Sequence, residues 1–388
     1  MKLALLRLLA CPSCGDELVL HAFDRTTEED GSGGRVQETR EGVLICRCGH
    51  AYPIIDGVPR LLEGALHQHS RFCERWHKEL TGVGALGERS LRPPSRQFRE
   101  LLAPTMARFG KEWGKHPIEE GTWGLDQGTR LEHALRYLRW RSDEAPGRVI
   151  LDAGCGNAKL TCGMAAWGAE VVGVDLSPGV VRGWRQRRRW AGEHACRVHV
   201  LQADLARPPF RPGVFDGIHS TGVLHHTPNT RQAFLTVAAL VRPGGSFGVW
   251  LYSKDRKDAG RIPWFPFVRA PWASIRVSTL RRLTPQLPPA LLYTFLLAYS
   301  SVFHLLYTAS AAIRGRKHPQ SIRERTTSLF DSLAPPYVWR HTVEELTQWF
   351  KEAGFGDITE TTVRGDDCGF CVTGSRPAEI PELKVVEN

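Results

Sequence analysis

Short apolar runs in the middle of the chain end repeatedly in glycine-rich or acidic turns. The run V-I-L-D-A begins at Val149 and leads into G-C-G-N, and a second run, V-V-G-V-D, ends on Asp175. Such runs are typical of buried strands, so the pattern predicts strand, glycine turn, helix and strand. Gly154 and Gly156 have no side chain that would keep a ligand away from the backbone. An acid nineteen residues beyond Gly156 can bond ribose hydroxyls, so the segment predicts a nucleotide-binding βαβ unit.

Three later segments narrow the choice of nucleotide. They are V-L-Q-A-D-L at 200–205, F-D-G-I-H-S-T-G-V-L-H-H at 215–226 and R-P-G-G-S-F-G-V-W at 242–250. The glycine turn by itself fits NAD or FAD equally well. L-D-A-G-C-G, however, resembles motif I of class I S-adenosylmethionine-dependent methyltransferases (methyltransferase type 11-like), and the other segments resemble that family's later motifs in the same order. The resemblance implies an α/β fold with a Rossmann-like seven-stranded sheet, and S-adenosylmethionine as the cofactor.

The resemblance also implies which residues bind this cofactor. They are Asp152, Gly154, Gly156, Asp175, Leu176, Asp204, Leu205 and Ser220. Asp175 is the expected ribose ligand, although it could also cap the following helix, and Asp204 is expected at the adenine amino group. One position departs from the family pattern, because Asn157-Ala158 stands where a third glycine is common. Alanine is the smallest substitute at a close helix-to-strand contact, so we expect binding to survive.

Four cysteines near the start of the chain predict a structural zinc site. Cys11 and Cys14 form a C-x-x-C pair, and Cys46 and Cys48 form a tighter C-x-C pair. Four thiolates can complete a tetrahedral zinc site, and the segment 48–62 resembles the zinc ribbon of the tRNA-methyltransferase-activator type. His50 could replace one thiolate. A redox pair and a ribbon without metal are the alternatives, although no thioredoxin-like pattern surrounds the cysteines.

Candidate catalytic side chains follow the fourth expected strand and lie in a later loop. His225 and His226 are expected beside the transferred methyl group, where a histidine suits a general base. Alternatively, one of them bonds adjacent backbone and orders the loop. The segment 328–342 resembles a family loop that crosses the mouth of the site, and it offers Asp331, Tyr337 and His341 as polar contacts to the acceptor. Trp113, in an F-G-x-x-W segment, covers the cofactor or seals a helix to the sheet.

An insert at about 254–327 interrupts the domain before its last strands. Residues 290–313 carry no formal charge, and Arg314, Arg316 and Lys317 follow. The length would suffice to cross a bilayer, but a single crossing would separate strands that must pair, so we expect no transmembrane span. The insert is either a helical lid or a segment of about 287–317 that lies on a membrane with basic and aromatic flanks.

The basic balance of the chain leaves several partners open. The formal net charge is +10, which permits contact with RNA, an anionic membrane or a phosphorylated substrate. Part of the surplus is an arginine cluster on the helix after Asp175, at Arg182, Arg185, Arg187, Arg188 and Arg189. We interpret this cluster as a solvated helix face rather than an anion site. The chain shows no secretory signal, and its cysteines suit a reducing compartment, so we expect a cytoplasmic protein. Association of this protein with a membrane stays an open alternative.

Together these features predict a zinc-ribbon domain at 1–63, a linker at 64–105 and a methyltransferase domain at 106–388. The expected function is methyl transfer from S-adenosylmethionine to a small-molecule, lipid-linked or sugar-linked acceptor. The alternatives are an rRNA or tRNA methyltransferase guided by the ribbon, and a non-catalytic cofactor-binding partner protein.

Overall fold

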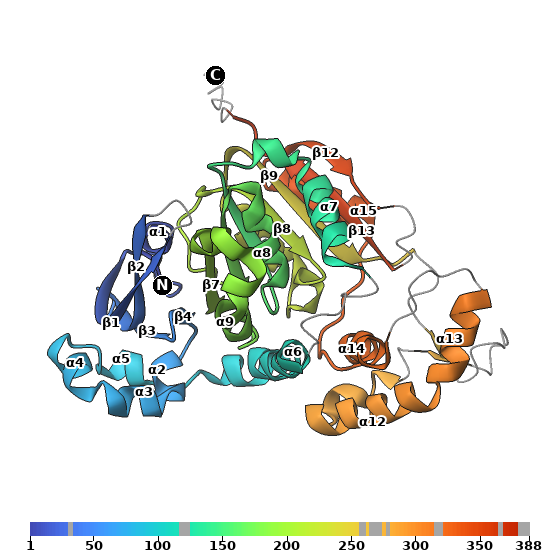
Figure 1. The fold of residues 1–388 in the computed structure, drawn as a ribbon, viewed down its shortest axis with the longest axis horizontal. Helices are drawn as coiled ribbons and strands as arrows, with labels where there is room; N and C mark the ends of the chain where they lie inside the picture. The colour runs from blue at the N-terminus through green and yellow to red at the C-terminus, as the bar shows by residue number, and fades with distance from the viewer. Residues whose placement is uncertain are drawn as a thin grey trace, which may run out of the picture.

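The protein is built on one long, mixed β-sheet. The computed structural model describes residues 1–29, 34–115, 125–255, 261–263, 274–276, 280–313, 321–363 and 368–378. The sheet has eleven strands in the order β1-β2-β3-β4-β7-β6-β5-β8-β9-β13-β12, and β10 pairs with β11 separately (Figure 1). The strands are β1 (Leu18–Glu29), β2 (Arg35–Cys46), β3 (Ala51–Ile55), β4 (Val58–Leu61), β5 (Val149–Ala153), β6 (Glu170–Asp175), β7 (Val198–Ala203), β8 (Phe215–Thr221), β9 (Val241–Tyr252), β10 (Arg261–Pro263), β11 (Ser274–Arg276), β12 (Gly356–Glu360) and β13 (Gly369–Ser375).

The seven strands from β7 to β12 confirm the predicted Rossmann-like sheet. Strands β7, β6, β5, β8 and β9 are parallel, and β13 pairs antiparallel with both β9 and β12. Within these seven strands the chain begins at β5 in the centre. It then adds β6 and β7 on one side, and afterwards β8, β9, β12 and β13 on the other. Ligands bind such sheets outside the carboxyl ends of the strands where the order reverses, which here is between β5 and β8.

Helices cover both faces of this sheet, and further helices lie beside the N-terminal strands and in the insert. They are α1 (Leu3–Leu6), α2 (Ala65–Gln68), α3 (Ser70–Arg75), α4 (His77–Gly82), α5 (Glu88–Leu91), α6 (Ala103–Lys115), α7 (Gln127–Leu138), α8 (Lys159–Met164), α9 (Val180–Ala191), α10 (Thr230–Ala238), α12 (Pro289–Val302), α13 (His304–Ile313), α14 (Ile322–Leu333) and α15 (Val343–Glu352), with a short 3-10 turn η5 (Leu224–His226). Helices α7, α8 and α9 pack on one face, and α10 and α15 pack on the other. A capping box begins α15, with Thr342 and Glu345 bonding each other's backbone.

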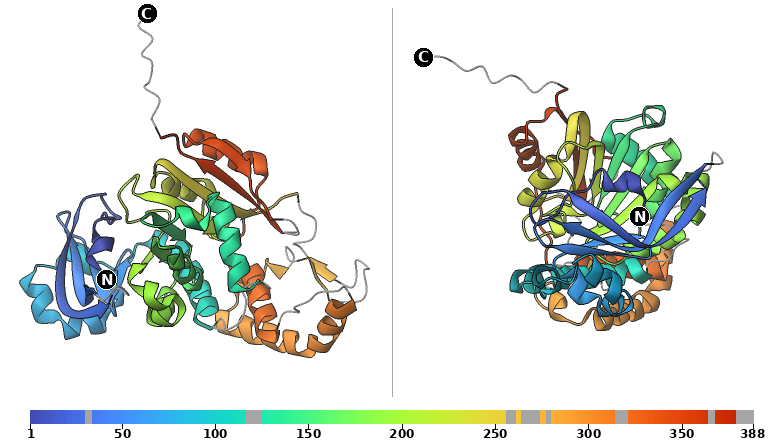
Figure 2. Two further views of the ribbon diagram at one scale, coloured as in Figure 1. Left: turned by 45° about the horizontal axis from the view of Figure 1, so that its top comes forward. Right: turned by 90° about the vertical axis from the view of Figure 1, so that its left-hand side faces the viewer.

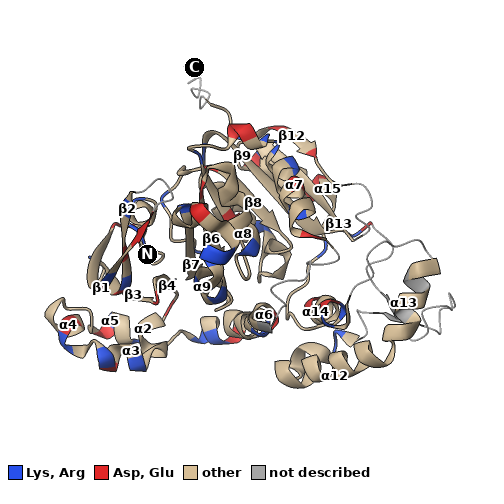
Figure 3. Cartoon of the chain, in the orientation of Figure 1, with Lys and Arg blue, Asp and Glu red and all other residues tan. Residues whose placement is uncertain are grey.

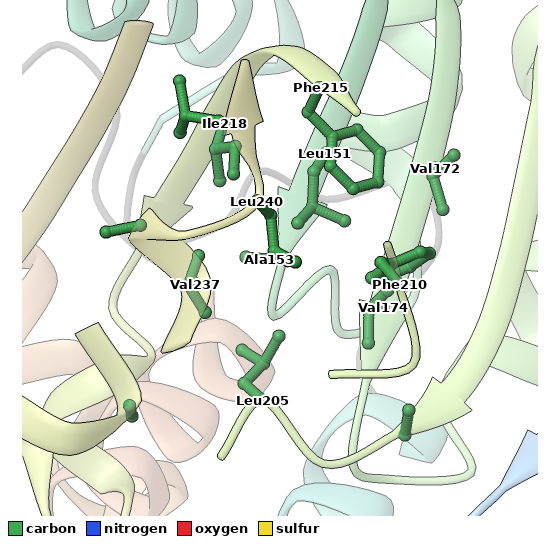
Figure 4. Close-up of a cluster of buried hydrophobic side chains, with 14 of the residues drawn as sticks. Leu151, Ala153, Val172, Val174, Leu205, Phe210, Phe215, Ile218, Val237 and Leu240 are labelled. Carbon is green, nitrogen blue, oxygen red and sulfur yellow. The ribbon is translucent and has the colours of Figure 1, made fainter. Parts of the chain in front are cut away.

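The central strands are apolar on both sides because both faces are covered. Leu151 and Val172 point into one core, shown in Figure 4, whereas Ile150 and Val171 point into the other. Leu151 is fully buried, as is Ile150. The unbroken apolar runs that predicted these strands therefore reflect burial on both faces.

The N-terminal strands continue the same sheet. Strands β1 to β4 form an antiparallel unit, and β4 then pairs in parallel with β7, with Arg60 opposite Gln202 and Leu61 opposite Ala203. Arg60 also donates a hydrogen bond from its guanidinium to the Gln202 side chain at 3.0 Å. The apolar cores of the two units are continuous. The edge of the methyltransferase sheet is therefore covered by the ribbon, a pairing that no local pattern had indicated.

The interpretation of the arginines on α9 as a solvated face was wrong for Arg187, whereas Arg185 and Arg188 are 65% and 68% exposed but also pair with acids. Arg187 is 8 % exposed, and its guanidinium bonds Glu28 at 3.2 Å and Glu38 at 2.9 Å. Arg188 bonds Glu28 at 2.8 Å, and Arg185 bonds Asp56 at 2.6 Å. All three acids belong to the N-terminal unit. These ion pairs therefore join that unit to α9. The carboxylates stabilise guanidinium charges that were expected to be stabilised by water.

The insert forms helices rather than extra strands of the main sheet. Helix α12 packs against α14 through Leu292, Leu296 and Phe330, and α13 follows it directly. These helices lie at the opposite end of the molecule from the N-terminal strands (Figure 2). Among the described residues, every helix is too short or too polar to cross a bilayer, as the sequence predicted.

Candidate functional site

The loop between β5 and α8, which we call the glycine cradle, has a backbone conformation that requires glycine at two positions. Gly154 has φ +90° and Gly156 has φ +57°, conformations that favour glycine. The amides of Gly154 and Cys155 both donate to the Val174 carbonyl, at 2.8 and 3.0 Å, which fixes the turn against β6. A Cβ on Gly154 would overlap the methyl groups of Val223. The loop thus presents bare backbone at the switch point of the sheet, as a bound nucleotide requires.

Ala158 occupies the position of the family's third glycine. It is fully buried at the start of α8 with φ +57°. The facing residue on α9 is Gly183, where an added Cβ would come within 2.5 Å of the Ala158 Cβ. The missing glycine of the turn is therefore offset by a glycine on the opposing helix.

Asp175 lies at the end of β6 and faces the same turn. Its carboxylate accepts hydrogen bonds from the Gly156 amide at 2.9 Å and the Ser177 amide at 2.8 Å. Burial raises the pKa of this carboxyl, while the Ser177 bonds and the Gly156 amide lower it. Gln202 donates its amide to the Leu176 carbonyl at 2.9 Å. Both oxygens of Asp175 therefore accept backbone amides and order this turn.

Two other predicted cofactor residues, Asp152 and Ser220, support the glycine cradle through hydrogen bonds to protein groups. Asp152 accepts a hydrogen bond from Thr161 at 2.6 Å and lies 3.4 Å from a ring nitrogen of His219. The hydroxyl of Ser220 donates to the Ala153 carbonyl at 3.0 Å. Because both side chains are buried and bonded to protein groups, the structure gives them a supporting position.

The expected adenine acid lies in a hollow between the two domains. Asp204 accepts a hydrogen bond from the Ala206 amide at 2.9 Å, and burial raises the pKa of its carboxyl. It lines a cavity of about 170 Å³ together with Tyr52, Phe98 and Asn229. Leu205, by contrast, packs its side chain into the core, so its backbone is what it can offer a ligand.

Helix α6 covers the cradle. The Trp113 ring lies against Gly156, where an added Cβ would come 2.6 Å from the indole. Arg182 donates to the carbonyls of Trp113 and Gly114 at 3.3 and 3.2 Å, which holds the end of α6 on α9. The alternative in which Trp113 covers the cofactor site is therefore the one that this geometry supports.

The same helix brings in a carboxyl that the sequence reasoning missed. Glu112 is 1 % exposed, and its Oε1 has no hydrogen-bond partner in the described part of the chain. Burial, followed by the charges of Asp331 and Asp175, raises the pKa of Glu112 well above its ordinary value. Glu112 therefore lies between the donor cradle and the Asp331 side of the site. Its only local signal was its place beside Trp113 in the F-G-x-x-W segment.

His226 is held in one defined tautomer. Its Nδ1 lies 2.8 Å from the Tyr337 carbonyl, which can only accept, so Nδ1 carries the hydrogen and Nε2 keeps its lone pair. Nε2 lies 3.9 Å from Asp331, whose other oxygen accepts from the Tyr252 hydroxyl at 2.9 Å. Burial lowers the pKa of His226, so the ring is neutral near pH 7. The Tyr337 carbonyl therefore fixes the orientation of the His226 ring.

The other two predicted histidines are His225 and His341. The His225 ring lies 4.3 Å from those of His226 and Tyr252, and burial lowers its pKa well below the ordinary value. His341 bonds Glu345 through Nδ1 at 3.0 Å. Tyr337 contributes its carbonyl to His226, whereas its phenol is only partly buried. Tyr252, at the end of β9, is a further site residue that the sequence did not single out.

Several buried polar atoms around this pocket lack partners. Within the described ranges, no hydrogen bond reaches either ring nitrogen of His225, Nε2 of His226, Nε2 of His341 or Oε1 of Glu112. Buried polar atoms are almost always paired in folded proteins. A bound cofactor and acceptor could supply the missing partners of these five atoms.

The four N-terminal cysteines converge as a metal site. The sulfurs of Cys14 and Cys46 are 3.4 Å apart, those of Cys11 and Cys48 are 3.8 Å apart, and all four lie within 4.8 Å of one another. Zinc–sulfur bonds of about 2.3 Å in a tetrahedron separate sulfurs by about 3.8 Å, so the set fits zinc. His50 lies with Nδ1 3.2 Å from the Cys48 sulfur. It therefore bonds a ligand from outside and does not replace one.

Comparison with known proteins identifies both parts. Residues 151–249 match the family model of a methyltransferase domain, and residues 2–57 match that of Trm112p-like proteins. A ubiquinone biosynthesis O-methyltransferase of Xanthomonas campestris is 33% identical over 157 residues, 39% of this chain and 61% of that protein. An uncharacterised protein of Synechococcus is 34% identical over 141 residues, 36% of this chain and 34% of that protein.

The chain thus spans less than two thirds of the length of these curated relatives. Among solved structures, a magnesium protoporphyrin IX methyltransferase of Synechocystis is similar with a TM-score of 0.40 and 15% identity, over 72% of this chain and 96% of that one. That likeness is too weak to carry an assignment. The two family matches agree with the seven-stranded sheet and the four-cysteine site: residues 151–249 are similar to a methyltransferase domain, and residues 2–57 are similar to Trm112p-like proteins.

Proposed function

We propose that this protein transfers a methyl group from S-adenosylmethionine to a small-molecule, lipid-linked or sugar-linked acceptor. The observation that carries the proposal is the free lone pair of His226 Nε2, buried beside the glycine cradle. Bound S-adenosylmethionine supplies an electrophilic sulfonium methyl group. An acceptor hydroxyl or amine gains nucleophilicity when it gives up its proton, and a buried neutral histidine can take it.

The surrounding residues orient this base and respond to its charge. The Tyr337 carbonyl fixes the ring, and Asp331 lies where a carboxylate would stabilise the imidazolium formed on proton uptake. Burial raises the pKa of Asp331, but His226 and the Tyr252 hydroxyl lower it. Helix α6 excludes water from this region through Glu112 and Trp113. We assign the binding of the donor to the cradle with Asp175 and Asp204.

An RNA acceptor receives less support from the charge distribution. Arg185, Arg187 and Arg188, the densest basic run of the sequence, pair with acids of the N-terminal unit. Phosphate contacts need free basic side chains. His226 is buried against Phe109 of α6, at 5.2 Å between ring centroids, and lies 3.9 Å from Asp331 of α14, which suits an acceptor smaller than a folded RNA.

The test follows a labelled methyl group. The full chain is incubated with methyl-labelled S-adenosylmethionine and, in parallel, with an organic-solvent extract, a water-soluble metabolite extract or total RNA from the source cells. We expect label in one of the two extracts, lost in His226→Gln with unchanged donor affinity, and retained in the surface control His67→Gln. Label that enters only RNA would establish the RNA alternative. Donor binding with no label in any pool would favour a non-catalytic partner protein.

A further inference from the structure

Exposed apolar side chains are concentrated in the insert. Among the described residues, twelve large apolar side chains are exposed, and eight of them lie between 283 and 313. These eight are Leu283, Leu287, Leu291, Phe295, Val302, Leu305, Leu306 and Ile313. We call them the α12–α13 surface. Proteins rarely leave such a patch open to water unless it binds a partner or a membrane.

The patch arises because α12 is apolar on all sides but covered on only one. Leu292 and Leu296 pack against Phe330 of α14. Leu291 and Phe295, one turn apart, point outwards, and Phe295 is 63% exposed. Helix α13 continues the surface with Leu305, which is 81% exposed. A helix that is apolar all round is normally buried, so the outer side of α12 and α13 lacks a covering layer in the described structure.

The charge of the insert indicates what covers the α12–α13 surface. Residues 259–323 contain nine Lys or Arg and no Asp or Glu. Figure 3 shows α12 and α13 without charged residues, and Arg282 and Arg323 at their flanks are exposed. An apolar surface flanked by the exposed Arg282 and Arg323, in a segment without acids, is complementary to anionic lipid headgroups over an acyl layer. A second copy of the chain would instead bring like charges together around the two-fold axis.

We propose that the α12–α13 surface docks on the surface of an anionic lipid bilayer. The two helices, of 14 and 10 residues, are too short to span it and lie in the interface with the outer side chains among the acyl chains. Helix α12 contacts α14 and α6, which carry Asp331 and Glu112. The docked surface therefore lies directly behind the walls of the proposed acceptor pocket. The docking does not depend on the proposed methyl transfer, since it concerns where the protein binds.

Vesicle flotation of the full chain tests this. Phosphatidylcholine vesicles with and without phosphatidylglycerol are the probes, and the variant is Phe295→Gln/Leu305→Gln. The control is Val19→Gln/Leu91→Gln, two exposed apolar side chains far from the insert. We expect flotation with the anionic vesicles, weakened by salt. The insert variant should lower the bound-to-free ratio at least about tenfold, or about 1.4 kcal/mol, because two apolar side chains no longer transfer from water to the acyl layer, and the control should bind as wild type.

The proposal is overturned if the folded wild-type chain floats with neither vesicle, or if the insert variant floats as well as wild type. It is also overturned if the wild type is a dimer by light scattering that the insert variant converts to monomer without any vesicle binding, since the surface would then join two copies. Circular dichroism of both variants verifies that they fold. Because flotation requires no catalysis, its failure leaves the methyl-transfer proposal untouched, and the failure of that proposal leaves this result standing.

Discussion

Replacing Gly154 by alanine tests whether the glycine cradle links the donor site to the acceptor site. Gly147 and Gly154 stand just before and just after β5, both with positive φ, +75° and +90°. An added Cβ at Gly147 meets no atom within 4 Å, whereas at Gly154 it would overlap the Val223 methyl groups and lie 2.7 Å from the Val223 Cβ. Gly147→Ala is therefore a control for backbone strain alone.

The expected costs follow from these surroundings. Backbone strain destabilises both variants by about 1–2 kcal/mol. Overpacking adds about 1–3 kcal/mol at Gly154, because a β-branched valine cannot rotate away. Val223 also accepts the His226 amide at 2.9 Å, so its displacement moves the proposed base. Urea unfolding should show the larger loss for Gly154→Ala, and calorimetry should show weaker S-adenosylmethionine binding by about tenfold, or about 1.4 kcal/mol.

Equal unfolding midpoints for the two variants would refute the steric part of this reasoning. Unchanged donor affinity in Gly154→Ala would refute the assignment of this loop as the cofactor cradle. If Gly154→Ala bound S-adenosylmethionine normally but lost turnover, the displacement of Val223 would affect His226 without affecting the donor site.

Three further predictions concern the metal, the domain junction and pH. Cys46→Ser should lose about one equivalent of zinc and unfold at lower urea, whereas Cys196→Ser should keep its metal; equal zinc contents would contradict the four-cysteine site. Arg187→Met removes the hydrogen bonds that Arg187 donates to Glu28 and Glu38, while Lys2 and Arg188 remain beside Glu28 and the Met1 amino group beside Glu38. It should cost about 1.5–3 kcal/mol, against less than about 1 kcal/mol for the exposed pair lost in Arg96→Met; similar urea midpoints would contradict a stabilising role of Arg187 at the junction. Burial lowers the pKa of His226, so the unfolded chain binds this proton more readily and its contribution to stability is lost as pH falls below about 6.5. His226→Gln should therefore lose less stability than wild type between pH 7 and about 5.5, and an equal or steeper loss would contradict a buried neutral ring.

The donor site could be predicted because its chemistry is local in sequence. Gly154, Gly156 and Asp175 lie within 22 residues of one another, and a strand, a turn and an acid at this spacing meet wherever the βαβ unit folds. The same holds for the cysteines, since each pair is nearly contiguous and two pairs suffice for a tetrahedron. The strands were predictable because burial on both faces leaves continuous apolar runs.

The proposed acceptor site follows only in part from the sequence. His225 and His226 were predicted from their place after the fourth strand, and their role stays a prediction. Glu112 and Tyr252 were missed because nothing near them in sequence marks them. They become neighbours of Asp331 only when α6, β9 and α14 assemble. The arginines of α9 were misread for the same reason, because their acidic partners lie about 130 to 160 residues away.

The sequence by itself determined the donor-binding turn, the class of sheet and the four metal ligands, because short-range spacing fixes which atoms can meet. The tertiary structure decided that β4 closes the sheet edge at β7, that α6 covers the glycine cradle, and that one side of α12 and α13 stays uncovered. Those outcomes depend on long-range packing, in which a charge or an apolar face acquires its role from whichever surface is brought against it.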